Sequence, residues 1–160
     1  MEAMKHSKKT KKRLSVPSQE DWGNYKADLD QKHAHSVFAG RTNAEMQPFF
    51  RLNPIERTEE LKWMPEVPFR FYMLGFRDFV MAKNFGFLNA SDTASCFLGL
   101  VLEKLDKHPQ HIIPIMPDLL PTLEYVGQNQ ALFEAAESIY GNCLEKLSRI
   151  KALYAAHKAS

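Results

Sequence analysis

The sequence predicts an all-α fold: an irregular bundle of five to six helices that ends in a long C-terminal helix. Apolar residues recur at spacings of three and four in several segments, as they do along one face of a helix. Capping residues or prolines precede these segments, and glycines or prolines follow them. The alternation of Val, Ile or Thr with paired turn residues that is typical of a sheet is missing from the sequence.

The composition is that of a single globular domain. The chain has 160 residues, of which 44% are hydrophobic and 25% charged, and these values exclude the disordered and collagen-like classes. Residues 1–16 hold six basic residues and one acidic residue, so residues 17–160 carry 15 basic and 18 acidic side chains. We therefore expect a flexible basic tail over 1–16 and a single helical domain over 17–160.

The first helix is expected to begin at Ser18, because this hydroxyl cap is followed by Asp21 in the first turn. A narrow apolar stripe starts at Trp22, and the helix should end by Gly40. The following residues, 41–53, form a loop or a short helix.

The next two elements have clear start signals. At Asn53-Pro54 a capping side chain precedes proline at the first helical position. At Pro68 the most apolar segment of the chain begins, and it breaks near Asn84 and Gly86. Because this segment is apolar on all sides, we expect a helix at the centre of the bundle.

The C-terminal half predicts three further elements. Ser91 caps a second buried helix that becomes charged only in its last two turns. Four prolines within 109–121 favour short turns, and a helix then starts at one of the last two prolines and ends at Gly127. From 129 to about 156, apolar residues recur at steps of three and four and predict the long C-terminal helix.

Three glycines lie inside apolar helical segments: Gly75, Gly99 and Gly141. Glycine in a helix interior is about 1 kcal/mol less favourable than alanine, so a compensating reason is expected. We interpret these positions as points where the three helices cross closely. A local kink without close contact is the alternative.

The sequence contains no phosphate-binding loop, dinucleotide-binding glycine turn, nucleophile elbow or HExxH pair. Cys96 and Cys143 have no metal or redox spacing, and no secretory signal is recognised, so we expect a reducing, cytoplasmic location. His108 and His111 are best explained as solvated or hydrogen-bonded side chains. We expect no metal, no cofactor and no membrane span, since a span needs roughly 18 apolar residues.

One charged cluster is expected to be solvated. Glu56, Glu59 and Glu60 share a short helix with Arg57 and Lys62. Carboxylates next to basic residues on a surface helix usually form an exposed charged face.

A candidate ligand site lies in the central apolar segment. Arg70 and Arg77 are seven residues apart, so they project from nearly the same stripe. Arg77 and Asp78 have no opposite charge three or four residues away, and a buried unpaired charge costs several kcal/mol. Either these side chains reach the surface or another helix, or the arginines line a pocket that binds a carboxylate or phosphate. Tyr72 and Lys83 are further candidates for this pocket.

The predicted C-terminal helix carries a candidate oligomer interface. Its apolar seam is close to a coiled-coil repeat and is wide enough to leave one edge uncovered. The candidate interface residues are Ile139, Leu147, Ile150 and Tyr154. We expect a two-fold homodimer. The alternative is that the core of the monomer buries the whole stripe.

Three functions stay open. The favoured one is a non-enzymatic helical interaction protein, such as an oligomeric adaptor, a regulatory partner or an immunity-type inhibitor, because catalytic motifs are missing and amphipathic helices abundant. The second is a helical protein, enzymes included, that binds a small molecule or anion through Arg70 and Arg77. The third is a nucleic-acid-associated protein whose lysine-rich tail, 1–16, binds phosphates without sequence specificity.

Overall fold

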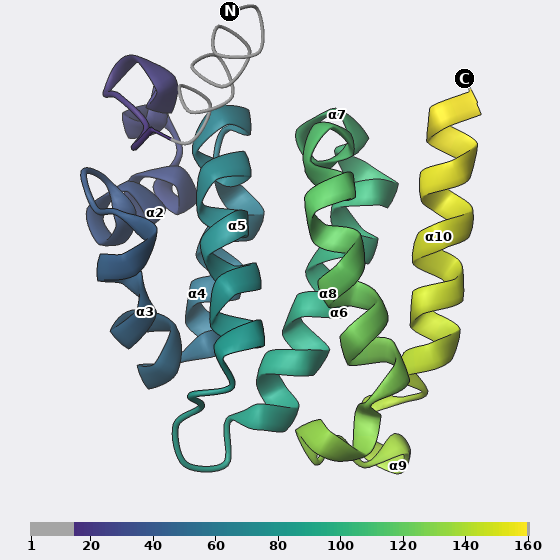
Figure 1. Ribbon diagram of the computed structural model, residues 1–160. Helices are drawn as coiled ribbons and strands as arrows, with labels where there is room; N and C mark the ends of the chain where they lie inside the picture. Colours follow the sequence, from purple (N-terminus) through teal and green to yellow (C-terminus); the bar gives the residue numbers. More distant parts are fainter. Residues whose placement is uncertain (1–14, 160) are drawn as a thin grey trace, which may run out of the picture.

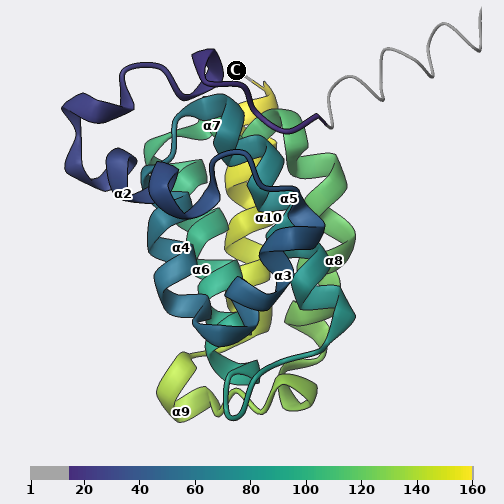
Figure 2. The same ribbon diagram turned by 90° about the vertical axis from the view of Figure 1, so that its left-hand side faces the viewer.

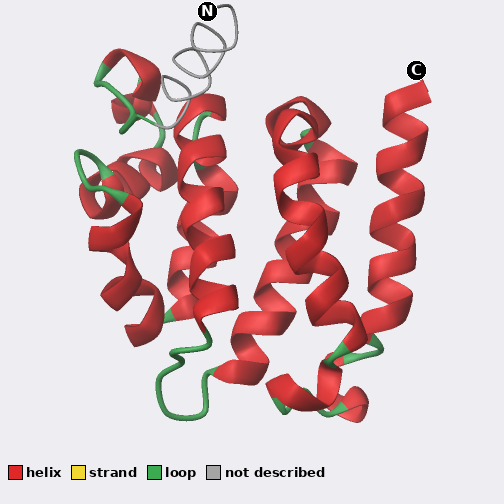
Figure 3. Cartoon of the chain, viewed as in Figure 1, coloured by secondary structure: helices red, strands yellow, loops and turns green. Residues whose placement is uncertain are grey.

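The computed structural model describes residues 15–159. In this part of the chain every regular element is helical, so the all-α prediction is confirmed (Figure 3). The helices are more numerous than the five to six predicted, because the described residues form nine α-helices and four 3-10 turns. The predicted tail lies outside the description except for Ser15 and Val16, and Val16 is half-buried against the core.

The first predicted helix is split into three elements. Ser18 and Asp21 cap each other: the Ser18 amide donates to Asp21 Oδ2 at 2.8 Å, and the Asp21 amide donates to Ser18 Oγ at 3.3 Å. Two 3-10 turns follow, η1 (Glu20–Trp22) and η2 (Tyr25–Ala27), before α2 (Leu29–Phe38). The glycine after η1 has φ 59°, a left-handed conformation that ends a helix.

Residues 41–53 form mainly a helix, α3 (Asn43–Leu52), which begins with a capping box. The predicted start at Asn53-Pro54 is confirmed. Asn53 Oδ1 accepts from the Glu56 amide at 3.1 Å, and α4 (Pro54–Trp63) follows.

Two long helices form the centre of the bundle: α5 (Glu66–Ala82) and α6 (Ala90–Lys107). Ten of the 17 residues of α5 are buried, as the all-round apolar pattern predicts. The predicted cap at Ser91 is wrong. The N-cap is Asn89, two residues earlier, and the Ser91 hydroxyl donates instead to the Tyr140 hydroxyl at 3.1 Å.

The proline-rich segment forms short turns and then a helix, as predicted. These elements are α7 (Pro109–Ile112), the 3-10 turn η3 (Ile113–Ile115) and α8 (Met116–Gln128). Pro121 lies inside α8, which ends one residue beyond Gly127.

The long C-terminal helix is wrong in its first half. The chain instead forms a 3-10 turn, η4 (Gln130–Phe133), a single turn, α9 (Glu137–Tyr140), and then α10 (Cys143–Ala159). Only the last of these is a long helix, and it extends three residues beyond the predicted end.

Backbone conformation and side-chain bonds explain this break. Gly141 has φ 79° and ends α9, and the next residue, Asn142, caps α10 by accepting from the Glu145 amide at 3.0 Å. Gln130 fixes the intervening loop, since its side chain donates to the carbonyls of Ala135 at 2.7 Å and Gly141 at 2.8 Å. The glycine-asparagine pair is a stop and a start signal that the continuous apolar spacing obscures.

The helices pack around α5 as one core. α2, α3 and α4 cover one side of α5, α6 to α8 lie on its other side, and α10 is outermost (Figures 1 and 2). A single cluster of buried apolar side chains runs from Trp22 to Ile150. Its centre is aromatic, with Phe76 stacked on Phe50 at 5.1 Å between ring centroids and edge-on to Phe97 at 5.4 Å.

The three glycines have three different environments. A Cβ at Gly75 would lie 2.2 Å from Asn43 Oδ1 on α3, so this position is a close helix contact. A Cβ at Gly99 would have no atom within 4 Å, and Gly141 lies outside any helix. The prediction of close helix crossings is therefore correct for Gly75 alone. The helix that packs against Gly75 is α3, which carries none of the three glycines.

Candidate interaction surface

Arg70 is held by α7 and by its own helix. Its guanidinium pairs with Glu66, one turn earlier, a local partner that the sequence reasoning missed. Its Nε donates to the His111 carbonyl at 3.1 Å, and its Nη2 donates to the Gln110 carbonyl at 2.6 Å. These bonds fasten the last turn of α7 against α5.

Arg77 lies two turns further along the same side of α5. It pairs with Asp78, the next residue, at 2.9 Å, and its Nη1 lies 3.4 Å from the Asp118 carbonyl of α8. Both predicted arginines therefore reach the segment that contains α7 and α8. The expected stripe is present, and the described contacts of each arginine are with the chain itself.

The other two predicted ligand residues lie elsewhere. Tyr72 is fully buried toward α2, with its hydroxyl 2.7 Å from the carbonyls of both Phe38 and Arg41, and burial raises its pKa to about 12. Lys83 follows α5, and its ammonium lies 4.5 Å from the centroid of the Tyr125 ring. The structure thus does not bring Arg70, Tyr72 and Lys83 to one place.

A buried lysine that the sequence analysis missed lies next to the Arg70 contacts. Lys104 is 1% exposed, its Nζ lies 3.2 Å from His111 Nδ1, and it stands over the Phe69 ring at 4.5 Å. Burial lowers the pKa of Lys104 to about 8. Burial and the nearby Lys104 charge lower the pKa of His111 to about 4. Lys104 lies four and three residues after the buried Leu100 and Val101, and this helical spacing is the sequence signal for its position.

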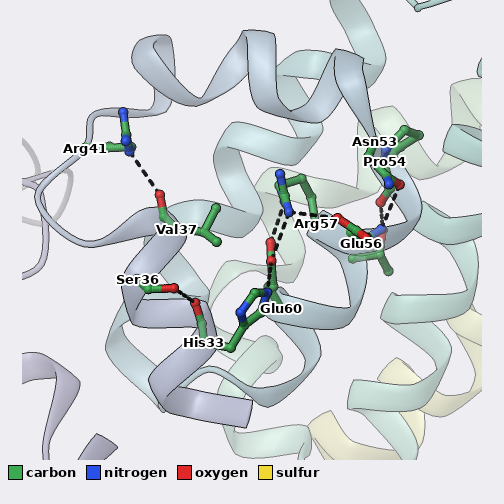
Figure 4. Close-up of polar contacts among 10 residues, drawn as sticks. His33, Ser36, Val37, Arg41, Asn53, Pro54, Glu56, Arg57 and Glu60 are labelled. Carbon is green, nitrogen blue, oxygen red and sulfur yellow. Dashed lines mark hydrogen bonds and ion pairs between the residues drawn. The ribbon is translucent and has the colours of Figure 1, made fainter. Parts of the chain in front are cut away.

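A buried ion pair within α4 is linked to α2 through His33 (Figure 4). Arg57 and Glu60 are 7% and 4% exposed, and their side chains make two hydrogen bonds, one of 2.9 Å to Glu60 Oε2. His33 Nε2 on α2 lies 2.8 Å from the same oxygen. The prediction of a solvated face is therefore wrong for Arg57 and Glu60, because α2 packs over them.

The four residues of the predicted oligomer interface differ in their exposure. Leu147 and Ile150 are 5% and 0% exposed, so they belong to the core of the monomer and are not available to a partner. Tyr154 is half-buried and packs against the core, whereas Ile139 on α9 is 76% exposed. The break before α10 separates Ile139 from the other three residues.

Several segments meet at the lower end of the bundle in Figure 1: α3 ends there, α4, α6 and α10 begin there, and α9 lies there. Among the described residues, seven of the eleven exposed large hydrophobic side chains belong to these segments, to the loop before α6 or to η4. We call them the end surface: Leu52, Ile55, Phe87, Leu88, Leu132, Ile139 and Leu144.

Several contacts hold the segments of the end surface together. Asn89 Nδ2 donates to the Arg51 carbonyl at 3.2 Å, which joins the loop before α6 to the end of α3. Tyr140 on α9 donates to Asp92 Oδ1 on α6 at 3.0 Å. Because the backbone is fixed in this way, the apolar side chains are presented on a defined frame.

The backbone at this end is also strained. The three non-glycine residues with left-handed φ among the described residues are Lys83 at 57°, Leu88 at 62° and Glu134 at 54°, and all three lie in its loops. A side chain in this conformation costs about 1–2 kcal/mol, and such strain concentrates at functional sites.

Within residues 15–159, no group of three or more His, Cys, Asp or Glu side chains is arranged to hold a metal ion. In the same part of the chain, no helix has both the length and the apolar character needed to cross a membrane.

Comparison of the chain with protein-family models, with curated proteins and with solved structures finds no match.

Proposed function

We propose that this chain is a non-enzymatic helical interaction protein that binds a protein partner through the end surface. The observation that carries the proposal is the exposure of Phe87 and Leu88, at 90% and 73%, among five other exposed apolar side chains. Burying a Phe or Leu side chain stabilises a protein by about 1.5–3 kcal/mol. The described chain does not obtain this stabilisation from Phe87 or Leu88, because both are exposed to water. Phe87 and Leu88 are adjacent in the chain, and exposed apolar surface rimmed by polar residues typically marks an interaction site.

The surroundings of the patch favour a protein as the ligand. Exposed charges of both signs border it, including Arg51, Lys83 and Glu134. An apolar centre with a charged rim is the usual composition of a protein–protein interface. The expected partner presents an apolar helix face or groove, and a cytoplasmic location is part of this proposal.

The test compares two variants that remove exposed apolar groups. The first, Phe87→Ser combined with Leu88→Ser, removes the most exposed part of the end surface. The matched control is Leu29→Ser, because Leu29 is 84% exposed at the start of α2, outside the end surface. Circular dichroism should show that both variants keep the helix content of the wild type.

Cross-linking and capture from an extract of cells that naturally contain this protein then reports the partner. We expect one protein to be captured by the wild type and by Leu29→Ser and to be lost with the double variant. Titration calorimetry with that purified partner should show binding about a hundredfold weaker for the double variant, corresponding to about 3 kcal/mol. Equal binding by all three proteins would contradict the proposal.

The two alternatives have less support. An anion site built on Arg70 and Arg77 would have to compete with the backbone carbonyls and carboxylates that these side chains already contact. Binding of nucleic acid through the basic tail stays a prediction, since residues 1–14 lie outside the described part of the chain.

A further inference from the structure

A second surface lies away from the end surface, on the outer side of α6 and α10. These helices enclose a shallow cleft of about 680 Å³. Its lining includes Gly99, Leu102 and Asp106 from α6, with Arg149 and Leu153 from α10. Leu102 and Leu153 are half-buried and pack against the core, so the middle of the cleft is apolar.

Gly99 is the first sign that the cleft is a contact. It lies in the middle of an 18-residue helix, where glycine lowers helix stability relative to alanine. A Cβ would meet no atom within 4 Å, and the backbone needs no left-handed conformation there. Packing within the described chain therefore gives no reason for the missing side chain, whereas close approach of another molecule does.

The charges of the cleft are the second sign. Glu103 is already paired, with Lys62 at 3.3 Å and Lys107 at 3.1 Å. Asp106 and Arg149 are exposed, and neither has a charged or hydrogen-bonding partner among the described side chains. The cleft thus retains one free anion on α6 and one free cation on α10.

These two charges lie at opposite ends of the cleft. Both helices run from the lower to the upper end of the bundle (Figure 1), and His157 Nε2 on α10 lies 2.8 Å from the Leu105 carbonyl on α6. Asp106 is the next residue after Leu105, so it lies near the level of His157. Arg149 lies eight residues before His157 on α10, toward the lower end. At 1.5 Å per residue, the two charges are separated by about 12 Å along the helices.

We propose that the cleft binds a second copy of this chain in an antiparallel, two-fold arrangement. When two clefts face each other across the two-fold axis, Arg149 of each copy lies opposite Asp106 of the other copy. The same operation brings Leu102 and Leu153 of both copies together near the axis, and Gly99 allows the backbones to approach. A surface with an anion at one end and a cation at the other is complementary to itself only in this antiparallel sense.

The test uses charge reversal and sedimentation velocity from about 1 to 200 μM. Asp106→Arg alone and Arg149→Asp alone each place like charges opposite one another, so each should weaken the dimer at least about tenfold. An equimolar mixture of the two variants should dimerise as well as the wild type, because both opposing pairs are then of opposite sign. Recovery in the mixture also shows that both variants are folded.

Two results would overturn the proposal: a wild-type protein that is monomeric over this range, or a dimer that neither charge reversal weakens. The Phe87→Ser and Leu88→Ser double variant serves as the control and should leave the dimer intact. If that variant abolishes the dimer while the charge reversals do not, self-association uses the end surface and the cleft has no part in it. None of these results decides whether the end surface binds a protein partner, because that proposal has its own test.

Discussion

Gly75 and Gly99 occupy equivalent places in two buried helices and have opposite surroundings. At Gly75 the helices α3 and α5 meet so closely that a Cβ would lie 2.2 Å from Asn43 Oδ1. Side chains of α3 seal the contact: Asn43 donates to the Phe71 carbonyl at 3.0 Å, and Gln47 donates to the Gly75 carbonyl at 3.1 Å. At Gly99 the corresponding space is open and forms part of the α6–α10 cleft.

One sequence pattern, a glycine inside an apolar helix, therefore has two structural outcomes. A glycine inside an apolar helix indicates that something comes close to the backbone, and the sequence does not say whether that neighbour belongs to the same chain. We call the α2–α5 half of the bundle the closed side and the α6–α10 cleft the open side. Substitutions on the closed side should lower stability, whereas substitutions in the cleft should leave it unchanged or raise it.

The largest effect is expected from the buried ion pair of the closed side. Arg57→Met removes the two hydrogen bonds to Glu60 and leaves a buried carboxylate with His33 alone. Breaking a buried pair by removing one partner typically destabilises by about 3–5 kcal/mol. Urea unfolding should show a loss of this size. Arg51→Met, on the exposed surface of α3, is the control and should change stability by less than about 0.5 kcal/mol. A loss below about 1 kcal/mol for Arg57→Met would contradict a closed side held by this pair.

The inner face of α6 supplies the next test, through pH. Burial lowers the pKa of Lys104 to about 8, so between pH 8 and 10 the folded state releases a proton that the unfolded lysine retains. Stability should therefore rise with pH in this window, by about 2 kcal/mol. Lys104→Met should abolish the rise and be more stable than the wild type at pH 7. An identical pH profile for both proteins would show that the Lys104 ammonium is not desolvated.

A smaller loss is expected at the close contact itself. Gly75→Ala places a methyl group against Asn43, and overpacking of this kind costs about 1–3 kcal/mol. Asn43→Ala should relieve part of the clash, so the double variant should lose less than the sum of the two single losses in urea unfolding. Additive losses would show that the two residues are not in contact.

The smallest effect has the opposite sign. Gly99→Ala adds a methyl group in open space and improves helix propensity, so it should stabilise the dilute monomer by about 0.5–1 kcal/mol. The same variant should weaken the proposed dimer in sedimentation. A loss of monomer stability would mean that the cleft is closed in solution.

The sequence predicted those features that depend on local signals. Asn53-Pro54 starts α4 because capping needs only neighbouring residues, and the segment after Pro68 becomes the central helix because it is apolar on every face. The break at Gly141 also has a local signal, the asparagine that follows it, but the apolar spacing continues across the break and indicates one unbroken helix.

The features that the sequence did not predict depend on neighbours distant in the chain. Glu60 looks like a surface carboxylate until α2 packs over α4, and Lys104 looks like a last-turn surface lysine until it meets Phe69 and His111. The end surface is assembled from segments between 52 and 144, so no single stretch of sequence reveals it. The cleft likewise depends on the packing of α10 against α6, which the spacing of apolar residues does not specify.

The most direct test of the contrast between the two glycines is an amide NMR dilution series on ¹⁵N-labelled protein, from about 500 μM to 10 μM. We expect the amide resonances of Gly99 and of the residues around Asp106 and Arg149 to shift with concentration, whereas the Gly75 resonance should not shift. Concentration-independent signals at Gly99, or equal shifts at both glycines, would contradict the claim that one contact is closed within the chain and the other is completed by a second copy.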